Sequence, residues 1–263
     1  MTEEGVAVRQ RPWAVLMVCT GNVCRSPLAE HLAAARFSAA LDQISLGAAG
    51  AQASGGTGGN ESSSEGWHPP SPAGDLLVSS AGVCARAGEA MYPQAAAILT
   101  SRGLDPSGFR ARLLTPDLVQ ASDLVLCATR AHRSTVVGLV PRAMRRTFTL
   151  REFGRVTSGV RPADIPPGGT RAAGEYLAAT ARRIRAAGHA LPAALDDLAD
   201  PLDGGRDAFE NCARMIEETL SRPMALLAEA CHERLAVTPT DPADPAGPAG
   251  LADVPVDRTP APG

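Results

Sequence analysis

An apolar run that ends on a cysteine, followed six residues later by an arginine, most constrains the fold of this chain. Residues Trp13–Cys19 are apolar, a short loop follows at 20–24, and Arg25, Ser26 and Pro27 open an alanine-rich segment. An apolar run of this length predicts a buried strand, and Ser followed by Pro is typical of a helix start. The pattern therefore predicts a strand, a tight loop and a helix, an arrangement that binds anions through backbone N–H groups.

Cys19 and Arg25 stand at the two ends of this loop, where thiolate attack on a phosphate needs them. Backbone N–H groups between them can converge on one oxyanion, and the planar guanidinium of Arg25 can hold two phosphate oxygens. The Ser26 hydroxyl can cap the helix and also donate to the thiolate. The predicted phosphate-binding residues are Thr20, Gly21, Asn22, Val23, Cys24, Arg25 and Ser26.

A second Cys and Arg pair with the same spacing, Cys127 and Arg133, shows that spacing alone is a weak signal. The two pairs differ in the residues that lie between the cysteine and the arginine. Gly21 and Asn22 tolerate the positive φ values of an anion-binding loop, whereas residues 128–132 contain neither glycine nor asparagine. The first pair is therefore the candidate site.

The run Cys-Thr-Gly-Asn-Val-Cys-Arg-Ser-Pro from Cys19 to Pro27 resembles the signature of the low-molecular-weight protein tyrosine phosphatases. The resemblance covers residues 12–44, 76–155 and 197–221. It implies a small flavodoxin-like fold and a cysteinyl-phosphate intermediate. No metal or other cofactor is expected, because Arg25 and the loop supply the positive potential. Thioredoxin-coupled arsenate reductases share this scaffold, so the resemblance leaves the reaction open.

Apolar strands alternate with helical patterns along the rest of the chain. We expect strands at Leu76–Gly82, Leu124–Cys127 and Arg146–Leu150, and the first helix at Pro27–Ala40. Alternation of this kind gives a parallel sheet covered on both faces, with binding at the carboxyl ends of the strands. The predicted fold is an α/β flavodoxin-like three-layer sandwich with a four-stranded parallel sheet, plus insertions.

Composition divides the chain into one domain and several less regular segments. We predict a phosphatase-like domain at 12–222, with a disordered Gly/Ser-rich insertion at 47–74 and a disordered Pro/Ala-rich tail at 236–263. A further insertion at 157–192 contains an Arg-rich helix and could be a lid, a partner surface or a tolerated addition. The last helix is expected at Arg206–Ser221, with Pro223 breaking or bending it.

A phosphate-ester hydrolase needs a group that protonates the leaving oxygen and then activates water. Four Asp-Pro pairs occur, and those at Asp241 and Asp244 lie in the predicted tail. Asp105 is expected to have a turn role. Asp200 precedes the last helix, as the acid loop does in the family that the chain resembles, so we assign it as general acid and base. Its acidic neighbours Asp196, Asp197 and Asp203 are expected to be solvated.

The resemblance also assigns supporting residues and reveals two departures. Ser80, in a Ser-Ala-Gly element, is expected to brace the loop through Asn22. Leu202 stands where family members usually carry an aromatic residue after the Asp-Pro pair, and Phe109 stands where animal members have a histidine that supports the loop. These departures affect ring-stacking specificity more than phosphoryl chemistry. His31 has no second His or Cys at metal-ligand spacing, so no metal site is predicted.

Charge and cysteine content restrict the partners and the compartment. A net charge of −3 and no long basic run argue against nucleic acid, and no segment is apolar enough to span a membrane. Six cysteines without a secretory signal indicate reduced thiols in the cytoplasm. The exception is Cys24, a candidate redox partner that could form a disulfide with Cys19.

The predicted function is cysteine-dependent hydrolysis of phosphotyrosine or other phosphomonoesters, on a phosphorylated protein or a small molecule. One alternative is thioredoxin-coupled arsenate reduction, although its thiol relay looks broken because Ser134 stands seven residues after Cys127. Another is a non-catalytic protein that binds phosphorylated partners. The presence of both Cys19 and Asp200 favours the enzyme.

Overall fold

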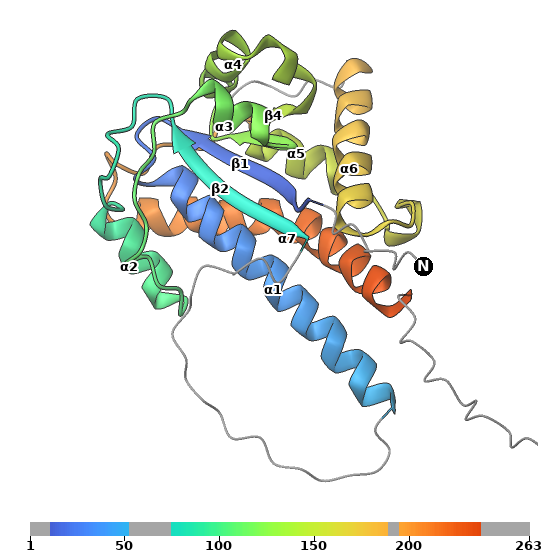
Figure 1. Cartoon of the computed structure of the whole chain (residues 1–263). Coiled ribbons are helices and arrows are strands. Elements are labelled where there is room, and N and C mark those ends of the chain that lie inside the picture. The colour runs from blue at the N-terminus through green and yellow to red at the C-terminus, as the bar shows by residue number, and fades with distance from the viewer. Residues whose placement is uncertain (1–10, 53–74, 189–194, 238–263) are drawn as a thin grey trace, which may run out of the picture.

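A four-stranded parallel sheet forms the centre of the protein (Figure 1). The computed structural model describes residues 11–52, 75–188 and 195–237. The strands are β1 (Trp13–Cys19), β2 (Leu76–Gly82), β3 (Leu124–Cys127) and β4 (Thr147–Thr149), in the order β2-β1-β3-β4. Each neighbouring pair is parallel. The predicted fold class is thus confirmed.

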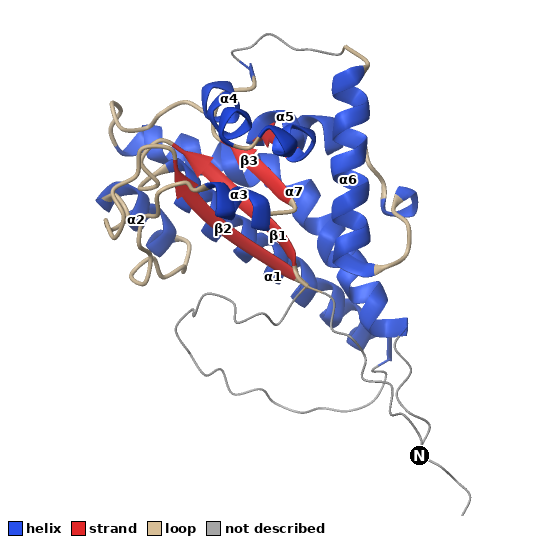
Figure 2. Ribbon diagram, turned by 45° about the horizontal axis from the view of Figure 1, so that its top comes forward, coloured by secondary structure: helices blue, strands red, loops and turns tan. Residues whose placement is uncertain are grey.

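Helices cover both faces of the sheet, because successive side chains of β1 point to opposite sides. Val15 and Met17 belong to a large core, whereas Leu16 and Val18 belong to a smaller one on the other face. Figures 1 and 2 show α1 and α7 side by side beneath the sheet. The helices that contribute to the large core are α1 (Arg25–Gln52), α2 (Pro93–Ser101), α5 (Leu150–Thr157), α6 (Gly169–Ala186) and α7 (Arg206–Val237). Those of the smaller core are α3 (Pro116–Ala121) and α4 (Arg130–Leu139), with the short 3-10 helix η1 (Pro141–Arg146); a second 3-10 turn, η2, spans Pro162–Asp164.

Helix α1 is longer at both ends than the predicted helix Pro27–Ala40. It begins at Arg25 and continues to Gln52, so residues 47–52 of the predicted insertion 47–74 are helical. The segment after Ala40 keeps alanine, leucine and glutamine among its residues, which are good helix formers. Residues 53–74 lie outside the described part of the chain.

Helix α7 runs without a break through Pro223 to Val237, past the predicted end at Ser221. A proline in a helix removes one backbone hydrogen bond. Burial of Met224, Leu227 and Cys231 in the large core offsets that loss. Ordered structure therefore continues beyond residue 222, and residues 238–263 of the predicted tail lie outside the described chain.

Helix α6, in the predicted insertion 157–192, packs into the large core. Gly174 lies so close to Trp13 that a Cβ atom there would overlap the indole ring, and the Arg171 guanidinium lies over the same ring at 5.4 Å from its centroid. Leu177 and Ala181 are buried. Trp13 is at the end of β1 opposite Cys19, so this part of α6 stabilises the far end of the sheet.

Candidate active site

The loop at 20–24 is held by hydrogen bonds to its carbonyl groups. Carbonyls of Cys19, Thr20 and Val23 accept from N–H groups within the segment 83–92, at 2.8–2.9 Å. A loop held in this way through its carbonyls can turn its N–H groups to the inner side, where they can bind an oxyanion. The loop lies at the carboxyl end of β1, as predicted.

Asn22 provides the sharp turn of the loop. Its φ is 52°, and it is the one non-glycine residue with positive φ in the ranges that the structure describes. Gly21, expected to share this conformation, does not adopt it. The buried Asn22 amide donates to Ser26 Oγ at 2.9 Å and to Ser80 Oγ at 2.8 Å, and its oxygen accepts from the Arg112 N–H at 2.7 Å. The expected contact between Ser80 and Asn22 is therefore present.

Cys19 Sγ lies 2.9 Å from Ser26 Oγ. Because Ser26 Oγ accepts a hydrogen bond from the Asn22 amide, its own hydroxyl proton can point to the sulfur. A hydroxyl that donates to sulfur favours the thiolate, which is the nucleophilic form of cysteine. Asn22 and Ser26 thus link the loop conformation to the chemistry of Cys19.

A buried acid, Glu30, supports this network and was not identified from the sequence. Ser80 Oγ donates to Glu30 Oε2 at 2.5 Å, and burial raises the pKa of the Glu30 carboxyl. The Arg112 guanidinium donates to the Ser80 carbonyl. The Phe109 ring packs edge-on against the His31 ring, with the two centroids 6.0 Å apart. Glu30 and Arg112 therefore brace Ser80 in a protein that has phenylalanine at position 109.

Arg25 joins the loop to Asp200. Its guanidinium is buried, with 7% of the side chain exposed, and Nη2 lies 2.5 Å from Asp200 Oδ2. Nη1 donates to the Leu198 carbonyl at 3.3 Å, and Nη2 donates to Thr20 Oγ1 at 3.4 Å. Asp200 remains 39% exposed. Two predicted site residues that are 175 positions apart thus form one ion pair.

The segment before Asp200 is fastened to two helices. Asp196 pairs with Arg155 of α5 at 2.9 Å, and Asp197 accepts from the Arg130 N–H at 2.7 Å. The Arg151 guanidinium donates to the Asp197 carbonyl at 3.0 Å. The expectation that Asp196 and Asp197 are merely solvated is wrong, because both carboxylates anchor this segment.

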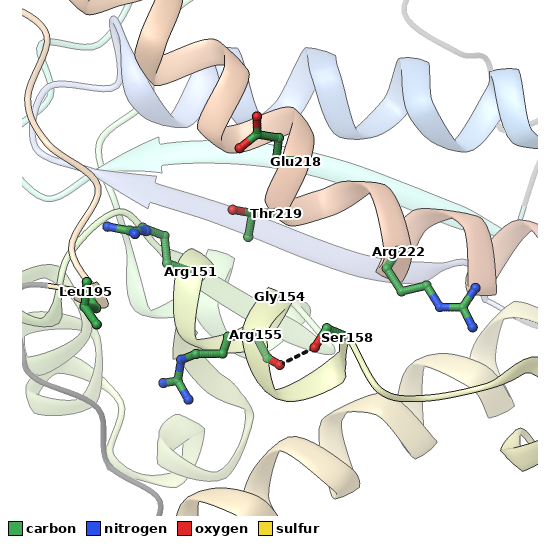
Figure 3. Close-up of a pocket in the computed structure, with 8 residues that line it drawn as sticks. All are labelled: Arg151, Gly154, Arg155, Ser158, Leu195, Glu218, Thr219 and Arg222. Carbon is green, nitrogen blue, oxygen red and sulfur yellow. Dashed lines mark hydrogen bonds between the residues drawn. The ribbon is translucent and has the colours of Figure 1, made fainter.

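A cavity of about 370 Å³ lies beside this anchor, between α5 and α7 (Figure 3). Arg151 and Arg155 point to the side where Leu195 lies, whereas Arg222 points the other way along α7. Arg222 donates to the Val160 carbonyl. The three guanidinium groups do not converge, so the cavity lacks the geometry of an anion site.

Asp105, the other Asp-Pro aspartate among the described residues, lies in a turn. Asp105 accepts from the N–H and hydroxyl of Ser107 at 2.8 and 2.9 Å, which confirms its predicted place in a turn. Asp241 and Asp244 lie outside the described residues. Of the two Asp-Pro aspartates that the structure describes, Asp200 is the one beside Arg25.

His132 also reaches the loop, which the sequence did not indicate. Its Nε2 lies 2.9 Å from Thr20 Oγ1, and its Nδ1 lies 2.8 Å from Thr129 Oγ1. Thr129 is the N-cap of α4. Burial, and then the nearby Arg25, lower the pKa of His132 to about 4. The imidazole is therefore neutral at physiological pH.

The cysteines differ sharply in their surroundings. Cys24 is buried, and burial together with the nearby Cys19 raises its pKa to about 12. Cys127 is fully buried in the smaller core, and burial raises its pKa as well. Cys84 is exposed. Across the described ranges, no three His, Cys, Asp or Glu side chains are grouped as metal ligands.

Leu202 lies at the rim of the site, beside Asp200. It is 45% exposed, and its N–H donates to Asp200 Oδ1 at 3.3 Å. Tyr92, whose N–H holds the Val23 carbonyl, stacks on Phe209 of α7 with parallel rings 5.5 Å apart. The Tyr92 ring thus packs against α7. The side chain next to Asp200, the candidate general acid, is the aliphatic Leu202.

Known proteins resemble this chain in sequence and in structure. The profile of the family "Low molecular weight phosphotyrosine protein phosphatase" matches residues 14–66 and 71–167. A low molecular weight protein-tyrosine-phosphatase of Streptomyces coelicolor is 29% identical over 226 residues, which are 85% of this chain and 99% of the relative. A protein-arginine-phosphatase of Geobacillus stearothermophilus is 28% identical, over 56% of this chain and 76% of its own.

Among solved structures, the YwlE arginine phosphatase from Geobacillus stearothermophilus has a TM-score of 0.49 at 22% identity, covering 86% of this chain and 96% of that one. The sequence matches define the class of the protein as an enzyme that hydrolyses phosphoric monoesters. More particularly, the chain belongs to the low molecular weight phosphotyrosine protein phosphatase family.

No helix in the described part of the chain is long and apolar enough to cross a membrane.

Proposed function

We propose that the protein dephosphorylates phosphorylated protein side chains or small phosphomonoesters, with Cys19 as nucleophile, Arg25 and the loop as the phosphate site and Asp200 as acid and base. The observation that carries the proposal is the 2.5 Å contact between Arg25 and Asp200. This contact supports the proposal because the Asp200 carboxylate meets the guanidinium that we propose to bind phosphate. Membership of the phosphatase family supports the same reaction class.

The reaction has two steps. The Cys19 thiolate attacks phosphorus while Asp200 gives its proton to the leaving oxygen, and a cysteinyl-phosphate forms. Asp200 then takes a proton from water, which attacks phosphorus and releases phosphate and the Cys19 thiolate. Arg25 and the loop N–H groups stabilise the equatorial oxygens in both steps. The Ser26 hydroxyl, 2.9 Å from Cys19 Sγ, stabilises the departing thiolate.

Asp200 has to leave Arg25 before it can act. In the structure the Asp200 carboxylate occupies the guanidinium edge that faces the site. An incoming phosphate competes for the same N–H groups, so substrate binding releases Asp200.

The proposed substrates include phosphotyrosine, as in the names of several relatives. Others are named protein-arginine-phosphatases, so a comparison of phosphotyrosine and phosphoarginine peptides identifies the preferred side chain. Arsenate reduction through a thiol relay gains no support, because Cys127 is fully buried and Ser134 stands seven residues later. The cytoplasm stays the predicted compartment.

The test is hydrolysis of p-nitrophenyl phosphate by Cys19→Ser, with vanadate binding measured in parallel. We expect turnover to be lost and vanadate binding retained, because the serine hydroxyl is scarcely ionised near neutral pH. Cys84→Ser is the matched control, since Cys84 is exposed next to the loop. Full activity of Cys19→Ser would refute the proposal.

A further inference from the structure

His132 connects the start of the phosphate loop to helix α4. It lies in the first turn of α4, is 7% exposed, and sits between two threonine hydroxyls at 2.8 and 2.9 Å. One of these is Thr20, which directly follows Cys19. The Thr20 oxygen also accepts from Arg25 Nη2. Two hydrogen bonds, with the Thr20 hydroxyl between them, therefore join the imidazole to Arg25.

The contacts of this chain of groups fit a neutral ring. Thr129 Oγ1 accepts from the His132 backbone N–H and also contacts Nδ1. A neutral imidazole has one donor and one acceptor nitrogen, and each threonine hydroxyl has one proton. A neutral ring can thus donate from Nδ1 to Thr129 and accept at Nε2 from Thr20, which directs the Thr20 hydroxyl proton to the ring. An imidazolium would donate at both nitrogens and remove that order.

We propose that His132 is a positioning residue of the phosphatase site, where the neutral imidazole holds the Thr20 hydroxyl and, through it, keeps Arg25 oriented to bind phosphate. This inference rests on the proposed function of Cys19, Arg25 and Asp200. It adds a group from the carboxyl end of β3 to a site otherwise built on β1, α1 and the segment before α7.

The charges around His132 agree with this role. Arg25 lies near the ring and disfavours a second cation, whereas Asp200 and Asp197 favour one. Burial exceeds each of these effects and keeps the ring neutral until the pH falls to about 4. Protonation there would place a cation beside Arg25 and weaken its contact with Thr20. Titration of His132 should therefore not change the phosphate affinity between pH 5 and 8.

The test compares His132→Leu with His132→Gln. The leucine removes both hydrogen bonds, and the glutamine amide retains a donor and an acceptor. We expect His132→Leu to weaken inorganic phosphate binding about tenfold, as for one lost buried hydrogen bond, and His132→Gln to stay within about threefold of the parent. Calorimetry in a Cys19→Ser background measures binding without turnover. Thr135→Ala is the control, since Thr135 is exposed on α4 and donates only to its own helix at Ala131.

A double-mutant cycle with Thr20→Val tests whether His132 acts through Thr20. If it does, the double variant binds phosphate no more weakly than the weaker single variant. Additive losses, or a His132→Leu variant with a lower Tm but unchanged phosphate affinity, would overturn the proposal. A histidine resonance that titrates near pH 6.5 and is assigned to His132 by NMR would also overturn it.

These outcomes are separate from failure of the proposed function. An inactive wild-type enzyme that still binds phosphate would refute the phosphatase reaction of Cys19, while the effect of His132 on phosphate affinity would still be measured. Conversely, normal turnover with a phosphate affinity insensitive to His132→Leu would refute only the role of His132.

Discussion

Replacement of Asp200 by asparagine should have opposite effects on phosphate binding and on turnover. Asparagine keeps the size of the side chain but removes the charge that pairs with Arg25 at 2.5 Å. In the proposed reaction of the parent protein, phosphate has to displace this carboxylate. The variant should therefore bind inorganic phosphate more tightly while it hydrolyses poor leaving groups more slowly.

The size of each effect follows from the surroundings of the pair. Ion pairs with an exposed partner contribute about 0.2–1 kcal/mol, and Asp200 is 39% exposed. We take the upper end because Arg25 is buried, so the phosphate affinity should rise up to about fivefold. Loss of a general acid lowers kcat by roughly 10²–10⁴ when the leaving group needs a proton. For p-nitrophenol, which leaves as a stable anion, the loss should be much smaller.

The assay measures kcat for phenyl phosphate and p-nitrophenyl phosphate, together with inhibition by inorganic phosphate. Asp105→Asn is the matched control, because it alters another Asp-Pro pair that lies in a turn. Equal losses of kcat on both substrates would refute the role of Asp200 as an acid. A weaker phosphate affinity in Asp200→Asn would refute the argument that the carboxylate competes with phosphate.

Three further changes probe oxidation, specificity and packing. Cys24→Ser should keep kcat but make peroxide inactivation irreversible to thiol reagents, and mass spectrometry of the oxidised parent should detect a Cys19–Cys24 disulfide; equal recovery would contradict this role. Leu202→Tyr should raise kcat/KM for phosphotyrosine peptides up to about tenfold, and by less for alkyl phosphates, since a ring contact contributes roughly 0.5–1.5 kcal/mol. Gly174→Ala should lower the free energy of unfolding by about 1–3 kcal/mol in urea titrations, because its Cβ would overlap the tryptophan at the start of β1. The exposed Gly138→Ala, with nothing near its Cβ, should cause no such loss.

The fold could be predicted because its signals are local in sequence. Each strand is a short apolar run, and the loop after β1 carries its cysteine, asparagine and arginine within seven residues. Helix ends were harder to predict. Pro223 indicates a helix end by its backbone chemistry, yet burial of Met224 and Leu227 keeps the helix intact. Tertiary packing here outweighs a local preference.

The contacts of the site that the sequence did not predict have a different cause. Glu30 contacts Ser80 across 50 positions of sequence, and His132 contacts Thr20 across 112. Neither residue belongs to a motif, and each has an ordinary role available on a helix. Only the parallel sheet brings the ends of β1, β2 and β3 together, so these contacts follow from the topology. Asp200 is assigned because its Asp-Pro pair precedes the last helix as the acid loop does in the family that the chain resembles, and its role as an acid stays a prediction.

Arg25 is the point at which these separate contributions meet. A buried guanidinium without a partner would be costly, and the pairing of Arg25 with Asp200 and the Leu198 carbonyl avoids this cost. In the proposed reaction Asp200, the more exposed partner, swings away when phosphate arrives, and the charge on Arg25 stays compensated throughout. The same movement frees the carboxyl that the reaction needs as an acid. Phosphate binding and activation of Asp200 are thus two results of one exchange of anions at Arg25.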